Sequence, residues 1–194
     1  MSIVSQDYLG EVVESSTALF TAECRELNGS PAFGSFVMTD TIPVVYGVVF
    51  NVSTRSMEPN RRPTAYGKTE EELRMEQPQI FELLRTEFEV AVIGFRDEEG
   101  PRRSLPPLPP RIHSFVNACP EADLKALTRN GDFVRAILSQ QRLPTDDLII
   151  AATRNAWHAR GYDMPYLVGL GKDLSRLVRD DYDRLSSMMR RITE

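Results

Sequence analysis

Few residues in this sequence could act as nucleophiles or bind metal ions. The chain has two cysteines, Cys24 and Cys119, and two histidines, His113 and His158. Cys119 lies close to His113 in the sequence, so the two side chains could form a nucleophile and its base. Cysteine is also one of the residue types most often found buried, and no catalytic motif surrounds either residue. We therefore expect structural roles for all four residues, and neither a cofactor nor a metal site.

Two groups of acidic residues could in principle bind a metal ion or transfer protons. The first, residues 97–99, has the composition of a turn. The second comprises Asp180, Asp181 and Asp183. In a helix, basic residues four positions away would pair with these carboxylates, giving a solvated face held by ion pairs. We expect a turn for the first group and an ion-paired helix face for the second, and we predict no catalytic residue in either.

Two glycine-containing fragments partly match the phosphate-binding loop of nucleotide hydrolases. Gly67-Lys68-Thr69 has the end of that motif, but Arg62 stands where its first glycine belongs. Residues 169–172 read Gly-Leu-Gly-Lys, but Asp173 follows in place of the hydroxyl residue and Tyr166 replaces the first glycine. The motif needs both glycines, because backbone N–H groups must wrap around the phosphates. The sequence predicts no Walker A loop, and we expect the protein not to be an enzyme.

A basic and aromatic segment is the best candidate for contact with a nucleic acid or a protein partner. Arginines could contact phosphates while a ring stacks on a base. Glu58 and the run 70–72 flank the segment and would repel a phosphate backbone. Nucleic-acid binding is therefore an open but less favoured hypothesis. The candidate contact residues are Arg55, Arg61, Arg62, Tyr66 and Lys68.

The composition is that of a globular protein. The 194 residues are 41% hydrophobic and 26% charged, with a formal net charge of −5. No apolar run is long enough to span a bilayer, and the first residues lack the features of a secretory signal. We expect a cytoplasmic protein without membrane contact. The overall acidity argues against nucleic-acid binding across the whole surface.

The first part of the chain predicts β-structure and the second part predicts helices. Mid-strand glycines at Gly47 and Gly94 favour a closed or sandwiched sheet. A helical insertion at about 55–87 begins its helix with a capping box from Thr69 to Glu72. The proline-rich run 105–110 predicts an extended strap. The expected strands cover 10–16, 17–24, 34–39, 44–53 and 88–95.

Helical patterns begin near Pro120 and continue to the C-terminus. We expect one long last helix from about Pro165 to Arg191. Apolar residues recur along it at spacings of four and three, which is typical of a coiled-coil contact between helices. This seam is our candidate oligomer interface. It comprises Leu174, Val178, Tyr182, Leu185, Met189 and Ile192.

The strand series resembles the HAS-barrel, the β-barrel of HerA-type DNA-translocating ATPases and of the catalytic-ring subunits of ATP synthase. The resemblance lies in the order of four elements. These are the opening strand 10–17, the Gly34-Ser35-Phe36-Val37 strand, the glycine-containing strand 45–52, and the strand 90–95 with its proline-rich exit. It covers about residues 3–119.

The resemblance implies a role in assembly. In the related ring ATPases the barrel is non-catalytic and helps to close the ring, and in HerA-type machines it is similar to a docking platform for a nuclease. The residues after the barrel are too few for a RecA-like ATPase core. We therefore expect a non-catalytic adaptor that docks onto a ring ATPase or a nuclease, or that self-associates. The expected fold class is α+β, with a Greek-key-like barrel at 1–119 and a helical region at 120–194.

Overall fold

The computed structural model describes residues 8–58, 62–140, 143–178 and 181–194. The strands are β1 (Gly10–Ser15), β2 (Leu19–Cys24), β3 (Phe36–Thr39), β4 (Val45–Ser56), β5 (Leu84–Asp97), β6 (Gly100–Arg102) and β7 (Phe115–Ala118). The helices are α1 (Glu70–Glu76), α2 (Gln79–Glu82), α3 (Glu121–Leu127), α4 (Asp132–Leu138), α5 (Thr145–His158), α6 (Met164–Leu177) and α7 (Tyr182–Thr193).

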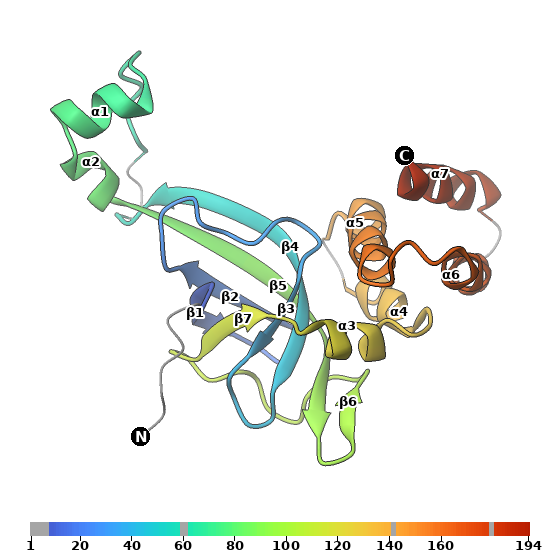
Figure 1. The fold of residues 1–194 in the computed structure, drawn as a ribbon. Helices are drawn as coiled ribbons and strands as arrows, with labels where there is room; N and C mark the ends of the chain where they lie inside the picture. The colour runs from blue at the N-terminus through green and yellow to red at the C-terminus, as the bar shows by residue number, and fades with distance from the viewer. Residues whose placement is uncertain (1–7, 59–61, 141–142, 179–180) are drawn as a thin grey trace.

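Six antiparallel strands close into a barrel. The strand order is β2-β1-β7-β3-β4-β5, and an additional pairing of β2 with β5 closes the ring. Strands β3, β4 and β5 are successive neighbours, whereas β2 reaches β5 from the other side, as in a Greek key. Strand β6 extends from β5 as a hairpin outside the ring (Figure 1). The predicted α+β class with an N-terminal barrel is confirmed.

The side chains of β4 alternate between two hydrophobic clusters. Val45 and Val49 point into the barrel with Val90 and Val92 of β5. The side chain of Tyr46 lies in the second cluster, outside the barrel. This period of two explains why the strand reads as an almost continuous apolar run, since both of its faces are buried.

Gly47 sits where β4 bends. The pairing of β4 with β5 shifts register between Tyr46 and Gly47. A Cβ atom at this position would lie 2.2 Å from Cγ1 of Val90 and 2.7 Å from the carbonyl oxygen of Ala91. The mid-strand glycine therefore permits close approach of two strands at a bulge, as the sequence pattern indicated.

The insertion forms an arm, which we define as residues 57–83 and which projects from the end of the β4–β5 ribbon (Figure 1). The expected insertion, 55–87, is too wide, because β4 continues to Ser56 and β5 begins at Leu84. Strand pairing from Thr54 to Ser56 extends the ribbon beyond the barrel. The predicted capping box of α1 is present, and neither α1 nor α2 contains a buried residue.

The helical region packs against one wall of the barrel. Outward-facing side chains of β4 and β5, including Tyr46 and Ile93, share one hydrophobic cluster with Phe133, Leu148 and Leu170 of the helices. The rings of Phe36 and Phe133 meet edge to face with their centroids 6.2 Å apart. The barrel wall and the helices therefore have a common core, and Figure 1 shows helices α3 to α7 gathered on this side.

The predicted long last helix is wrong, because the chain breaks between α6 and α7. Val178 has φ −101° and ψ 57°, outside helical values, and Asp181 starts α7 by accepting a hydrogen bond from the Arg184 N–H at 3.0 Å. Val178 and Ile192 both reach the shared core. Folding back lets both apolar stretches be buried. No helix among the described residues is long and apolar enough to cross a membrane.

Candidate functional site

The basic residues predicted to form one patch lie at the base of the arm and along it. Arg55 stands on β4 and forms an ion pair with Glu87, whose side chain is only 4% exposed. Arg61 lies outside the described residues. Arg62 and Tyr66 line one cavity of about 220 Å³, together with Ile80. The structure therefore places Arg62 and Tyr66 in one cavity. Arg55 does not line this cavity and is held by an ion pair with the buried Glu87 carboxylate.

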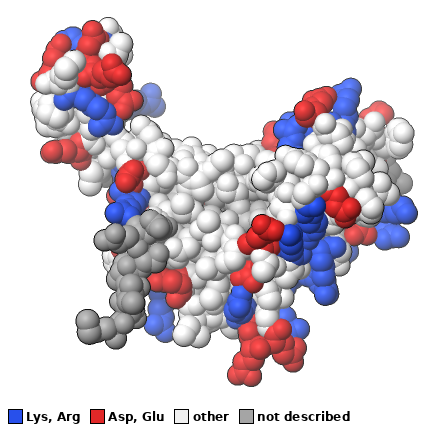
Figure 2. All heavy atoms as spheres, in the orientation of Figure 1, with Lys and Arg blue, Asp and Glu red and all other residues white. Residues whose placement is uncertain are grey.

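Acidic neighbours offset much of the positive charge on the arm. Lys68 forms an ion pair with Glu76. Arg74 donates to Glu70 at 2.7 Å, and its guanidinium lies 4.4 Å from the centroid of the Phe81 ring. Figure 2 shows basic and acidic side chains mixed over the arm. This charge mixture favours contact with a protein over contact with a continuous phosphate backbone.

The two fragments that resemble a phosphate-binding loop have other structural uses. Thr69 is the N-cap of α1, where its hydroxyl accepts from the Glu72 N–H and its own N–H donates to the Glu72 carboxylate. These contacts lower the pKa of the Glu72 carboxyl, with the backbone hydrogen bond from Thr69 as the larger cause. Gly169 and Gly171 lie inside α6. Their N–H groups belong to a helix interior and cannot wrap around a phosphate.

Most residues of the predicted oligomer seam pack inside the chain itself. Leu174, Val178 and Ile192 are at most 6% exposed and belong to the shared core. Leu185 and Met189 are partly buried against the same cluster. These five side chains therefore have little surface left for a second copy, because the break before α7 turns the seam inward. Tyr182, the remaining member, is 79% exposed.

The first acidic group forms local ion pairs, whereas in the second group Asp181 caps α7 and Arg184 pairs with a residue of another helix. Asp97 and Glu99 both pair with Arg102, and the Arg102 hydrogen bond lowers the pKa of the Asp97 carboxyl. Asp180 lies outside the described residues. Arg184 donates to Asp146 of α5, with its Nε 2.9 Å from Oδ1. Within the described part of the chain, no three His, Cys, Asp or Glu side chains are grouped so that they could hold a metal ion.

Cys119 shares a cavity with a different histidine from the one that the sequence suggested. Cys119 and His158 line one cavity of about 430 Å³ with Asn155, whereas His113 pairs with Glu11. No local sequence pattern pointed to this grouping, since His158 at the end of α5 is far from Cys119 along the chain. Burial, with a further contribution from Asp123, raises the pKa of the Cys119 thiol to about 12. The thiol is therefore not activated as a nucleophile.

We expect both cysteines to react slowly with iodoacetamide at pH 8. Burial raises the pKa of Cys24 to about 11, which is lower than that of Cys119, so thiolate is scarce at both positions and scarcer at Cys119. Alkylation followed by peptide mass spectrometry should show Cys24 reacting before Cys119, and the unfolded chain should react fastest at both sites. Faster labelling of Cys119 in the folded chain than in the unfolded chain would contradict the assignment.

A polar cluster of Tyr46, Arg96 and Asp123 joins the barrel to α3. The Tyr46 hydroxyl donates to Asp123 Oδ2 at 2.8 Å, and Arg96 Nε donates to the Tyr46 oxygen at 2.8 Å. Burial, as the largest cause, raises the pKa of the Tyr46 hydroxyl to about 12, so the group stays protonated and can donate. The cluster fixes α3 against the barrel and has the chemistry of a structural joint.

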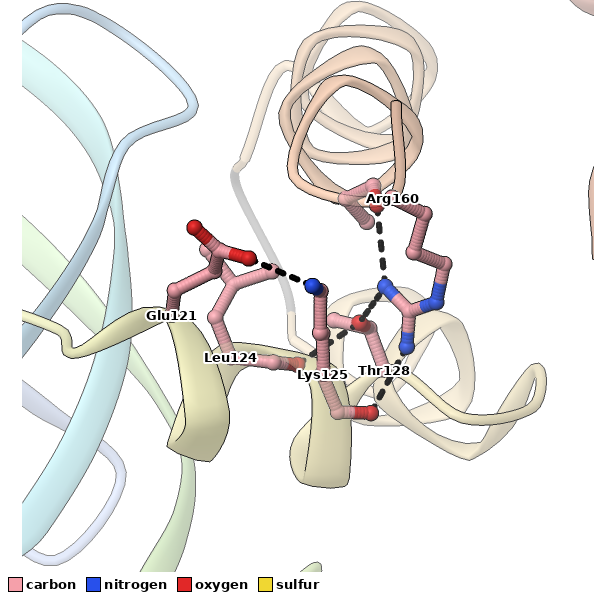
Figure 3. Close-up of polar contacts among 6 residues, drawn as sticks. Glu121, Leu124, Lys125, Thr128 and Arg160 are labelled. Atoms are coloured by element: carbon pink, nitrogen blue, oxygen red, sulfur yellow. Dashed lines mark hydrogen bonds and ion pairs between the residues drawn. The ribbon is translucent and has the colours of Figure 1, made fainter. Parts of the chain in front are cut away.

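Arg160, which follows the end of α5, links that helix to α3 through hydrogen bonds (Figure 3). Its guanidinium donates to the carbonyl oxygen of Lys125 at 2.7 Å and to the Thr128 hydroxyl at 2.9 Å. It also lies 4.0 Å from the centroid of the Tyr166 ring. The carbonyl groups at the end of α3 have no partners within that helix, so Arg160 completes its C-terminus.

Replacing Arg160 with alanine should lower the free energy of unfolding by about 2 kcal/mol, because charge-assisted hydrogen bonds to α3 are lost. Urea denaturation followed by Trp157 fluorescence measures the change. Arg160→Lys should recover only part of the loss, since one ammonium group cannot reproduce the guanidinium fork. Equal stability of the alanine variant and the wild type would show that solvent replaces Arg160 at the end of α3.

The two walls of the barrel differ in what covers them. The helices cover the side formed by β3, β4 and β5. On the opposite side, which we call the open wall, β2, β1 and β7 are neighbours. Its outward side chains are partly exposed, whereas the alternate residues Val12, Ala22 and Val116 are buried in the barrel. The open wall carries Glu11, Thr21, Glu23 and Asn117.

Comparison with known proteins identifies the barrel. A search of curated proteins finds no match to this chain. Residues 9–98 match the family model described as the HAS barrel domain. The match covers β1 to β5 and ends before β7, the strand that lies between β1 and β3 in the ring. The closed antiparallel topology and this match agree with each other, and the N-terminal barrel of this chain is a HAS barrel domain.

Proposed function

We propose that this protein is a non-catalytic adaptor that uses its HAS barrel to dock onto a ring ATPase of the HerA or ATP synthase type. The observation that carries the proposal is the difference between the two barrel walls. One wall is covered by the helices of the same chain, which leaves the open wall for a neighbour. A second copy of this chain is an alternative neighbour for the same wall.

The surface chemistry of the open wall supports a protein partner. Thr21, Glu23 and Asn117 present polar and acidic groups on a paired sheet. Glu23 lies 4.0 Å from Arg85, so its charge is only partly offset. A mixed polar surface of this kind fits a reversible protein interface better than a phosphate backbone.

Co-migration with a HerA-type ring ATPase from the same genome tests the proposal. Size-exclusion chromatography with light scattering should show the purified chain and the ATPase in one complex. Thr21→Arg on the open wall should weaken the complex, because it places a long charged side chain at the interface. Arg190→Glu on α7 is the matched control and should leave the complex unchanged.

The remaining outcomes distinguish the alternatives. If the chain alone self-associates and Thr21→Arg abolishes this association, the partner at the open wall is a second copy of the chain and not the ATPase. Binding of single-stranded DNA at low salt, with a steep loss as salt rises, would favour a nucleic-acid-binding accessory protein. A chain that remains monomeric and binds neither would overturn the adaptor function.

A further inference from the structure

A groove runs between the β6 hairpin and helices α3 and α4. It consists of two adjoining cavities of about 570 and 320 Å³. Arg103, Ser104 and Asp132 line both cavities, so the two are continuous. We call this feature the arginine groove. It lies where the HAS barrel meets the helical region, and none of the sequence motifs pointed to it.

The arginine groove is electropositive although the chain as a whole is acidic. Two acidic residues line it, Glu99 and Asp132. Four basic residues face them, which leaves an excess of positive charge in a protein whose formal net charge is −5. The basic residues are Arg102, Arg103, Arg129 and Arg135.

Two of these arginines are already engaged and two are not. Arg102 pairs with Asp97 and Glu99. Arg103 lies 3.5 Å from Asp132 and donates to Asn130 at 2.9 Å. Arg129 and Arg135 are exposed, and neither has an acidic partner within the part of the chain that the structure describes.

The smaller cavity adds an apolar surface beside Arg135. Its lining includes Ile93 of β5, Ala136 of α4 and Leu105 at the start of the proline-rich strap. Leu105 is 53% exposed, so part of its apolar surface is open to a ligand. A ligand that fills both cavities would therefore bury apolar surface in the smaller one while presenting charge to Arg129 in the larger and to Arg135 in the smaller.

We propose that the arginine groove binds an extended acidic segment of a partner protein, with an apolar side chain over Leu105 and carboxylates at Arg129 and Arg135. The inference deepens the proposed adaptor function by assigning a second contact and the chemistry of the partner. An extended peptide suits the site because its successive side chains point to opposite sides. Leucines can thus face the apolar floor while glutamates face the arginines.

A nucleic acid fits the arginine groove less well. No aromatic residue lines either cavity, so bases would have no ring on which to stack. Glu99 and Asp132 would also repel a continuous phosphate backbone. A peptide can place its few carboxylates at the two exposed arginines and avoid those acids.

Fluorescence anisotropy with a defined probe tests this proposal on the intact chain. The probe is a short fluorescein-labelled peptide of alternating leucine and glutamate. The wild type should bind it and should lose affinity as salt rises. The double variant Arg129→Glu, Arg135→Glu should bind at least about tenfold more weakly, because two attractive contacts become repulsive. Leu105→Ser should weaken binding severalfold without any change in charge.

Matched controls decide the outcome. The double variant Arg111→Glu, Arg190→Glu makes the same change in net charge away from the groove and should keep wild-type affinity. Failure of the wild type to bind the probe, or an equal loss in this control, would overturn the proposal. Equal binding of a leucine–lysine peptide, or displacement of the probe by oligodeoxythymidine, would also overturn it. Peptide binding needs no ATPase ring, so it can succeed or fail independently of co-migration with the ATPase.

Discussion

Gly47→Ala should lower the free energy of unfolding by about 3 kcal/mol or more. The added methyl group would lie 2.2 Å from a Val90 methyl group in the barrel interior and 2.7 Å from a backbone oxygen of β5. Neither neighbour can move easily, because Val90 is fully buried and the oxygen belongs to the paired strand. Overpacking at such a site forces strands apart and disturbs the closure of the barrel.

Gly169→Ala is the matched control, since it adds the same methyl group elsewhere. Apart from the adjacent backbone of its own helix α6, no atom of the described residues lies within 4 Å of a Cβ atom at Gly169. Alanine is a better helix former than glycine, so this variant should be more stable by about 0.5–1 kcal/mol. Urea denaturation followed by circular dichroism should therefore show shifts of opposite sign. A Gly47→Ala variant as stable as the wild type would mean that the bulge in β4 relaxes at little cost.

Phe133→Ala should destabilise the barrel as well as the helices, by about 3–5 kcal/mol. Phe133 is fully buried and contacts the ring of Phe36 on β3. The cavity left by the ring would lie in the core that both parts share. Because neither part can lose this contact alone, we expect one cooperative transition at a lower urea concentration.

Two probes follow the two parts separately. Trp157 is the only tryptophan and reports on α5, whereas hydrogen exchange measured by mass spectrometry follows the amides of β4 and β5. Both should shift together in Phe133→Ala. Met75→Ala, at a side chain that is 78% exposed on the arm, should leave both within about 0.5 kcal/mol of wild type. A shift in Trp157 fluorescence alone would show that the barrel folds independently of the helices.

Local patterns predicted strands β1 to β5 and the start of the arm, whereas β6 and β7 were not predicted. Val45, Val48 and Val49 lie in a β-branched run around Gly47, and such a run predicts a strand without information from distant residues. The capping box of Thr69 and Glu72 is a contact over three residues, so the sequence contains all of it. The family resemblance rested on the same local elements in order, and the family match over 9–98 covers the same strands.

The last helix could not be predicted in the same way. The spacing from Leu174 to Ile192 is equally compatible with one long helix and with two helices that fold onto a common core. Packing decides between them, because the shared core accepts both Leu174 and Ile192 only when the chain turns after Val178. The candidate oligomer seam therefore became part of the interior of the chain.

The sequence by itself determined strands β1 to β5, the arm and the scarcity of chemically reactive groups, because each depends on residue types and short spacings. Only the tertiary structure inserted β7 into the ring, brought His158 and Cys119 to one cavity, joined Asp123 to the barrel, and brought Arg129 and Arg135 to one groove. These groupings join residues from separate elements. Their positions follow from how the helices bury the outer face of β4 and β5, which is a property of the whole packed chain.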